Sequence, residues 1–120
     1  MSGLVVDASI EVHSILGPGL LESAYEKCLA FELRQRGCVV ASQVLLPLTY
    51  KGISLDVGYR IDLLVEDTVI VEIKTAERLG PVHEAQLLSY LKLSGKKVGL
   101  LINFHVPLVK DGIKRMVNGL

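Results

Sequence analysis

Apolar residues recur every three or four positions along the first part of the chain, which is the spacing of an amphipathic helix. Within residues 4–16 they are Leu4, Val5, Ala8, Val12 and Ile15. This pattern predicts a first helix that ends at Gly17-Pro18-Gly19, because neither proline nor glycine extends a helix without cost. The same spacing predicts a second helix over about residues 20–36, with Gly37 as its C-terminal cap.

After the second helix the pattern changes to runs of β-branched and apolar residues with a period of two, which indicates strands. Four strands are predicted, at residues 38–49, 53–57, 59–66 and 69–75. The turn at 66–68 is so short that it predicts an antiparallel hairpin.

The last third of the chain predicts a helix over about 82–93, opened by Pro81, and an apolar strand over 97–103. Residues 108–118 fit either a strand or a helix. The predicted order is therefore α-α-β-β-β-β-α-β, an α/β (α+β) fold with helices on at least one face of a sheet. The unit 69–103 predicts a right-handed crossover that joins two parallel strands.

Length and composition predict one globular domain over residues 1–120, since half of the residues are hydrophobic and 22% are charged. The 13 basic and 13 acidic residues give a net charge of zero, so the overall charge gives no indication of a nucleic-acid partner. We expect a cytoplasmic protein with no signal peptide and no membrane span. Cys28 and Cys38 match no metal spacing and are expected to be reduced and apolar.

Three charged residues interrupt the apolar strand runs: Asp62, Glu72 and Lys74. Buried charges are costly unless they are paired or bind a metal. Because side chains alternate along a strand, Glu72 and Lys74 share one face. Whether Asp62 lies beside Glu72 depends on the register of the hairpin, which the turn at 66–68 makes reasonable without fixing it.

If the two carboxylates meet, their oxygen atoms suit Mg²⁺ or Mn²⁺, and the amine of Lys74 can hold a water or stabilise developing negative charge. This chemistry is that of metal-assisted phosphodiester hydrolysis. The alternative is structural: Glu72 and Lys74 form a solvated surface pair, and Asp62 belongs to a turn or a sheet edge. The pattern of the sequence leaves both interpretations open.

Two further groups bear on this choice. His83, Gln86 and Tyr90 form a polar stripe along one face of the predicted helix, which either faces solvent or supports a substrate and Lys74. Glu22 lies in a first helical turn, where it either favours the helix dipole or supplies another carboxylate to a metal. The two remaining histidines, His13 and His105, are expected to be structural or exposed.

The chain resembles the PD-(D/E)XK nuclease superfamily and, within it, the GxxExxY protein family. The name-giving residues are Gly19, Glu22 and Tyr25, and the superfamily motif is matched by Asp62 and Glu72-Ile73-Lys74. Gln86 and Tyr90 resemble the Gln-x-x-x-Tyr motif of exonuclease-like branches. Ile61 stands where the superfamily commonly has a proline before the aspartate.

This resemblance implies a restriction-endonuclease-like core, in which a mixed sheet is flanked by helices. It implies that a magnesium (or manganese) ion is bound by Asp62 and Glu72, with the Ile73 carbonyl and Glu22 as additional ligands. Lys74 would position the attacking water. The residues implied as substrate contacts or supports are Gln86, Tyr90, Gly19, Tyr25 and Arg60.

Three functions follow as hypotheses. The first is a Mg²⁺-dependent nuclease that cuts DNA, with RNA as the second choice. The second is a non-catalytic nucleic-acid-binding module, motivated by the zero net charge. The third is a homo-oligomeric interaction protein, motivated by a mean hydropathy of +0.44. A homodimer is expected, and it is compatible with the first hypothesis.

Overall fold

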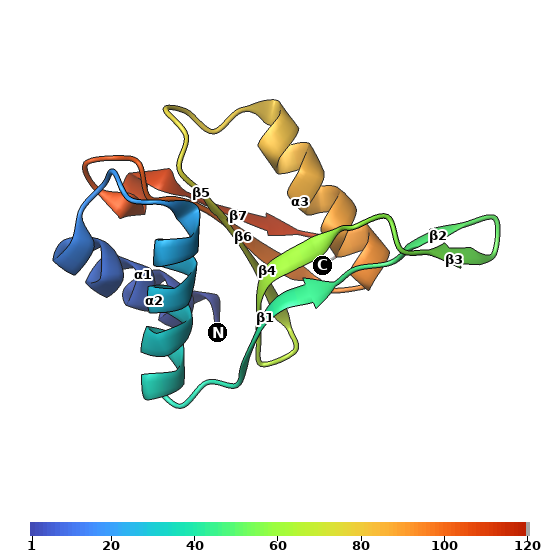
Figure 1. The fold of residues 1–120 in the computed structure, drawn as a ribbon, viewed down its shortest axis with the longest axis horizontal. Helices are drawn as coiled ribbons and strands as arrows, with labels where there is room; N and C mark the ends of the chain where they lie inside the picture. The colour runs from blue at the N-terminus through green and yellow to red at the C-terminus, as the bar shows by residue number, and fades with distance from the viewer. Residues whose placement is uncertain (120) are drawn as a thin grey trace.

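The computed structural model describes residues 1–119; Leu120, the last residue of the predicted domain, lies outside the described residues. The elements are, in order, α1 (Ser2–Leu16), α2 (Glu22–Gln35), β1 (Val40–Leu45), β2 (Leu48–Tyr50), β3 (Ile53–Leu55), β4 (Arg60–Val65), β5 (Val69–Lys74), α3 (Pro81–Ser94), β6 (Val98–Asn103), the 3₁₀ turn η1 (Val109–Gly112) and β7 (Ile113–Val117). Figure 1 shows them as helices around a twisted sheet, with a small hairpin that projects from it.

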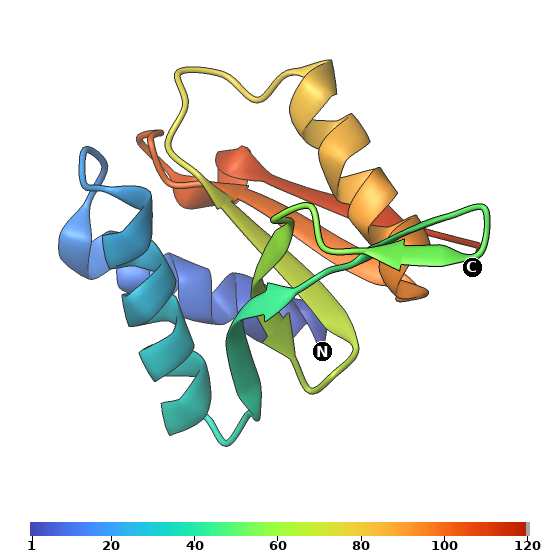
Figure 2. The ribbon, with the colours of Figure 1, turned by 45° about the vertical axis from the view of Figure 1, so that its right-hand side comes forward.

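The main sheet has the strand order β1-β4-β5-β6-β7, while β2 and β3 form a separate two-stranded sheet. β5 and β6 are parallel, and the other neighbours are antiparallel. The predicted mixed sheet and the parallel pair on either side of α3 are therefore confirmed. The helices α1 and α2 cover one face of the sheet, and α3 covers the other. Figures 1 and 2 show this arrangement from two directions.

Two apolar cores result from the alternation of side chains along the strands. Val71 and Ile73 of β5 pack into the core under α1 and α2, whereas Ile70 packs into the core under α3. This alternation matters for function because Glu72 lies between Val71 and Ile73 in the strand. Its side chain therefore points to the opposite face of the sheet, the face that α3 covers. The predicted division of β5 into two faces is confirmed.

The end of α2 is determined by a short local motif. Gly37 adopts a φ of 91°, a left-handed conformation that costs glycine little. Its N–H donates to the carbonyl of Arg34, and the N–H of Cys38 donates to the carbonyl of Leu33. These two bonds are those of a Schellman motif, so the prediction of Gly37 as the cap is confirmed.

The predicted single strand over 38–49 is wrong. The structure divides it into β1, in the main sheet, and β2, in the projecting hairpin. Pro47 lies between them, and it has no N–H with which to continue a ladder. The undecided segment 108–118 forms η1 and then the edge strand β7. The fold thus has two more strands than the predicted order.

The described helices are short. The longest of them, α1, has 15 residues. None within residues 1–119 combines the length and apolar character that crossing a lipid bilayer would require.

Candidate active site

The two central antiparallel strands separate at a pair of carboxylates. β4 and β5 pair as far as Leu63 and Val71. Beyond them, the backbone N–H of Asp62 donates to Glu72 Oε2, and the backbone N–H of Ile73 donates to Asp62 Oδ2, each at 2.9 Å. The carboxylates thus replace carbonyl oxygens of a continued ladder. The structure thus places Asp62 beside Glu72, a question that the sequence left open.

Glu72 is buried, with only 4% of its surface exposed. Burial, and secondly the negative charge of Asp62, raise the pKa of Glu72 to about 8. The hydrogen bond from the Asp62 N–H and the charge of Lys74 act in the opposite direction. Without a further cation, the Glu72 carboxyl is therefore mostly protonated at neutral pH, which shows how strongly this position favours positive charge nearby.

Lys74 is held by the helix on the same face of the sheet. Its Nζ donates to Gln86 Oε1 at 3.1 Å, and Gln86 Nε2 lies 3.5 Å from the Tyr90 hydroxyl. Both partners belong to α3. Burial and the nearby Glu72 raise the pKa of the Tyr90 phenol, so it stays protonated. The structure therefore brings the predicted Gln86 and Tyr90 to Lys74.

The third residue of the predicted helical stripe has a different role. His83 Nδ1 accepts a hydrogen bond from the backbone N–H of Gly80 at 3.0 Å, so it caps the start of α3. His13 is also structural: it is buried, and its Nε2 lies 3.1 Å from the carbonyl oxygen of Phe104. His105 is exposed, so the expectation for the two histidines is confirmed.

The helix α2 contributes two carboxylates to this region. Glu22 Oε2 accepts from the backbone N–H of Thr75 at 3.2 Å, so Glu22 reaches the end of β5. Glu26 lies closer to the pair: Gln43 Nε2 donates to Glu26 Oε1 at 2.7 Å and to Asp62 Oδ1 at 3.2 Å. Burial, and then the charge of Asp62, raise the pKa of Glu26. The site is more acidic than the motif alone implies.

Glu26 and Gln43 are absent from the sequence-based site. Glu26 had a readable signal, because it follows Glu22 by one helical turn and therefore shares its face. Gln43 had none, since its place opposite Asp62 depends on the register between β1 and β4. Its φ of 51° is left-handed, a conformation that is costly for a residue with a side chain and that often occurs at functional sites.

Gly19 and Tyr25 build the loop that leads into α2. The Tyr25 hydroxyl donates to the carbonyl of Gly17 and accepts from the N–H of Leu20, while its ring stacks on Phe104 at 4.5 Å. Gly19 has a φ of 102°, which only glycine adopts readily. These contacts position Glu22 at the start of α2, and they do not involve the carboxylates of Asp62 and Glu72.

The side chains of Arg60 and Ile73 form no observed hydrogen bond or ion pair with the carboxylates of Asp62 and Glu72. The Arg60 guanidinium lies 3.6 Å from Asp56 and bonds the carbonyl of Tyr59, so its observed contacts are outside the carboxylate pair. The Ile73 side chain is buried under α1 and α2, and only its backbone faces Asp62. The roles predicted for Arg60 and for the Ile73 carbonyl stay predictions.

A comparison with family models matches residues 1–116 to the PD-(D/E)XK nuclease superfamily. The chain belongs to this superfamily. Among solved structures, the crystal structure of LHK-Exo in complex with dAMP is similar, with a TM-score of 0.50 and 14% identity, over 98% of this chain and 83% of that one. At this identity the likeness shows the fold. A search of curated proteins found no match.

PD-(D/E)XK nucleases generally use divalent metal ions. The donor chemistry here fits one, because Asp62 and Glu72 offer hard oxygen atoms and Glu72 lacks sufficient positive charge nearby. No three His, Cys, Asp or Glu side chains within residues 1–119 form a ready metal cage. The fit is therefore to an ion held by one or two carboxylates together with water and phosphate, the manner in which Mg²⁺ commonly binds.

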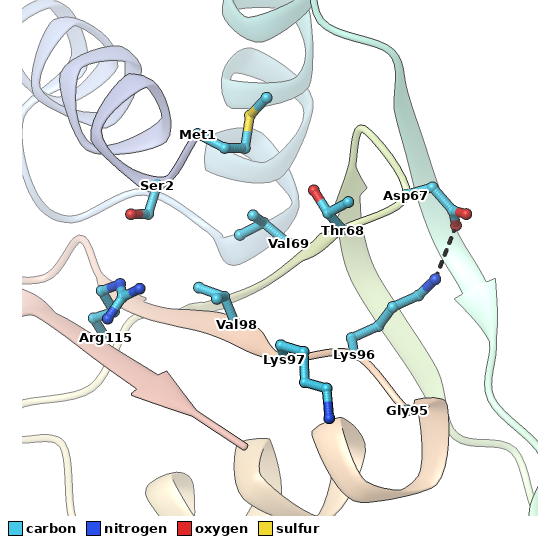
Figure 3. Close-up of a pocket in the computed structure, with 10 residues that line it drawn as sticks. All are labelled: Met1, Ser2, Asp67, Thr68, Val69, Gly95, Lys96, Lys97, Val98 and Arg115. Carbon is cyan, nitrogen blue, oxygen red and sulfur yellow. Dashed lines mark hydrogen bonds and ion pairs between the residues drawn. The ribbon is translucent and has the colours of Figure 1, made fainter. Parts of the chain in front are cut away.

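A cavity of about 420 Å³ lies at the opposite end of β5, away from the PD-(D/E)XK residues. Its wall includes Val69, Lys97 and Arg115, and Figure 3 shows the ion pair between Lys96 and Asp67 at its side. None of the predicted site residues lines it. Cavity size alone therefore does not identify the candidate site.

Proposed function

We propose that this protein is a Mg²⁺-dependent (or Mn²⁺-dependent) nuclease that hydrolyses phosphodiester bonds of DNA. The observation that carries the proposal is the reciprocal bonding between the strand segments of Asp62 and Glu72 where β4 and β5 separate. Lys74 follows Glu72 by two residues in β5. Membership of the PD-(D/E)XK superfamily supports a nuclease-type function. The similar LHK-Exo was crystallised in complex with dAMP, which supports a nucleotide substrate for this chain as well.

Each residue of the chain has a distinct task in this proposal. Asp62 and Glu72 would hold the cation directly, while the Ile73 carbonyl and Glu22 are proposed to complete its surroundings. When bound, a divalent ion polarises a phosphoryl oxygen and lowers the pKa of water. Lys74 orients the attacking water and stabilises charge on the phosphoryl oxygens. Water adds to phosphorus and releases a proton to solvent, the P–O bond to the leaving oxygen breaks, and that oxygen takes up a proton from solvent.

The helix α3 supports this chemistry through Lys74. The Lys74 ammonium has three donors on a flexible stem, and its bond to Gln86 restricts where those donors point. Tyr90 in turn contacts Gln86 from a buried position. We therefore assign Gln86 and Tyr90 as supports of Lys74, and Glu26 with Gln43 as supports of Asp62.

The finer classification is also a proposal. Gly19, Glu22 and Tyr25, which together build the entry to α2, support membership of the GxxExxY family. We propose that residues 1–120 form one domain, since both apolar cores share the main sheet. The two cysteines, neither of which forms a disulfide, support a reducing, cytoplasmic setting.

The test is a cleavage assay with single-stranded DNA, double-stranded DNA and RNA, in Mg²⁺, in Mn²⁺ and in EDTA. We expect metal-dependent cutting of DNA that Asp62→Asn and Lys74→Met each reduce by roughly 10²-fold or more. Asp7→Asn is the matched control, because Asp7 is an exposed carboxylate on α1 and is not among the proposed site residues. Cutting that survives both Asp62→Asn and Lys74→Met rejects the proposed site.

A non-catalytic nucleic-acid-binding module is the second candidate. The zero net charge favours it, because tight binding of phosphate by a catalytic site usually involves many basic residues. Salt-dependent DNA binding without cutting in either metal would support this alternative. A homodimer is compatible with both candidates; sedimentation at micromolar concentration tests it, and a monomer would reject it.

A further inference from the structure

A second aromatic residue adjoins the candidate site. Tyr59 immediately precedes β4, and its ring lies 5.7 Å from that of Tyr90, with an angle of 46° between the two planes. Tyr90 is buried, whereas 40% of Tyr59 is exposed. The ring of Tyr59 thus rests on a fixed neighbour and keeps part of its surface open. In Figure 2 the link into β4 runs beside the helix that carries Tyr90.

The two rings form one side of a groove. Its volume is about 290 Å³, close to the lower end of the range of ligand sites, and its wall includes Tyr59, Ala85, Gln86, Ser89 and Tyr90. The lining residues are largely apolar and aromatic, and they also include the amide of Gln86 and the hydroxyls of serine and tyrosine. A flat, partly polar group fits this combination better than a purely aliphatic group does.

The groove is continuous with the phosphodiester site. Gln86 lines the groove and also accepts the hydrogen bond from Lys74 at 3.1 Å. Tyr90 lines the groove and is close enough to Glu72 for that charge to affect its phenol. A ligand with its phosphate at Lys74 and Glu72 therefore places the next part of the molecule against Tyr59 and Tyr90.

We propose that this groove is a nucleobase subsite in which Tyr59 stacks on one unpaired base of the nucleic acid. The inference rests on the proposed function, which places the adjoining phosphate at Asp62, Glu72 and Lys74. Bases within a duplex are stacked on both faces, so only a single strand or a frayed end offers a free face to a tyrosine ring. The substrate class is therefore nucleic acid with at least one unpaired nucleotide at the cleavage site.

The test is a binding measurement that does not depend on cleavage. The probes are a short oligothymidylate, an abasic strand with the same number of phosphates and a blunt duplex, with Ca²⁺ in place of Mg²⁺ and affinities read by anisotropy. We expect the oligothymidylate to bind roughly tenfold more tightly than the abasic strand, the size of effect that one stacked base gives. Tyr59→Leu removes this preference, and Tyr59→Phe keeps it.

Two further variants separate stacking from general damage. Tyr50→Leu is the matched control, because Tyr50 is also an exposed tyrosine, on the projecting hairpin, and does not line the groove. It should keep the preference. Ala85→Phe fills the groove from α3 while Tyr59 stays in place, and it should lose the preference. This variant decides the matter if Tyr59→Leu does not fold.

Every outcome bears on the subsite independently of catalysis. Equal binding of the oligothymidylate and the abasic strand by the unmodified protein overturns the inference, as does a preference that survives both Tyr59→Leu and Ala85→Phe. If cutting depends on Asp62 but binding shows no preference for the oligothymidylate over the abasic strand, the proposed function stands and the subsite fails. If base-dependent binding occurs without any cutting, the subsite stands and the proposed hydrolysis fails.

Discussion

The backbone N–H of Asp62 donates to the carboxylate of Glu72 at 2.9 Å, and the backbone N–H of Ile73, the residue after Glu72, donates to the carboxylate of Asp62. This exchange holds two acidic side chains together at the point where β4 and β5 separate. The interaction of each carboxylate with a backbone donor offsets part of its repulsion by the other. Burial, together with the repulsion that remains, raises the pKa of Glu72, and the first two predictions depend on this raised pKa.

The free energy of unfolding of the metal-free protein should fall as the pH rises from about 4.5 to about 8. In this range Glu72 is ionised in the unfolded state but still protonated in the folded state. The folded pKa is raised to about 8 from an ordinary value of 4.5, so this contribution to stability is complete below pH 4.5 and is lost by pH 8. Glu72→Gln can still accept the Asp62 N–H but cannot ionise. In EDTA, the variant should gain about 1–3 kcal/mol relative to the unmodified protein between pH 5 and pH 8, measured by urea unfolding. A constant difference across this range would contradict the prediction.

Mg²⁺ should stabilise the protein, and the effect should be larger at pH 8 than at pH 6. A cation beside Glu72 favours the ionised carboxylate, so it competes with a proton that the lower pH supplies. At an ion concentration a hundred times the dissociation constant, the expected gain is about 2.7 kcal/mol, visible as a rise in Tm. Asp62→Asn should remove most of it, while Asp7→Asn should not. An equal gain in the Asp62→Asn variant would place the ion elsewhere.

Gln86→Leu should impair catalysis less than Lys74→Met does. The leucine removes the 3.1 Å bond that restrains the Lys74 ammonium but leaves its charge in place. We expect a loss of roughly tenfold in kcat for Gln86→Leu against roughly 10²-fold or more for Lys74→Met. The activity of the unmodified protein should also rise between pH 6 and pH 9. A flat pH profile, or equal losses in the two variants, would contradict these roles.

Tyr25→Phe should reduce stability and leave the chemistry of the site nearly unchanged. The hydroxyl joins the carbonyl of Gly17 to the N–H of Leu20, and phenylalanine keeps the stacking on Phe104 while it loses both bonds. The free energy of unfolding should fall by about 1–2 kcal/mol. DNA affinity and cleavage below the Tm should change by less than about threefold, since the hydroxyl's own bonds lie within the loop before α2. A large loss of affinity with unchanged stability would instead assign Tyr25 to the substrate.

Periodicity alone was sufficient for most of the local structure. Helical spacing in the first 36 residues and around Gln86 yields α1, α2 and α3, because an amphipathic helix shows its buried face directly in the sequence. The hairpin from β4 to β5 could be predicted from the length of its turn, since only three residues separate the two strands. The segment around Pro47 was misjudged because an apolar run does not show which partner strand it pairs with.

What the sequence by itself determined is the hairpin that carries Asp62 and Glu72, and the choice of Asp62, Glu72 and Lys74 as the proposed reacting groups. Only the tertiary structure decided that Glu26 and Gln43 join Asp62 and that Tyr59 packs on Tyr90. The physical reason is distance along the chain. Local hydrogen bonds and alternation specify neighbours within an element, whereas contacts between α2, β1 and β4, or between α3 and the link before β4, depend on how separate elements pack on the shared sheet.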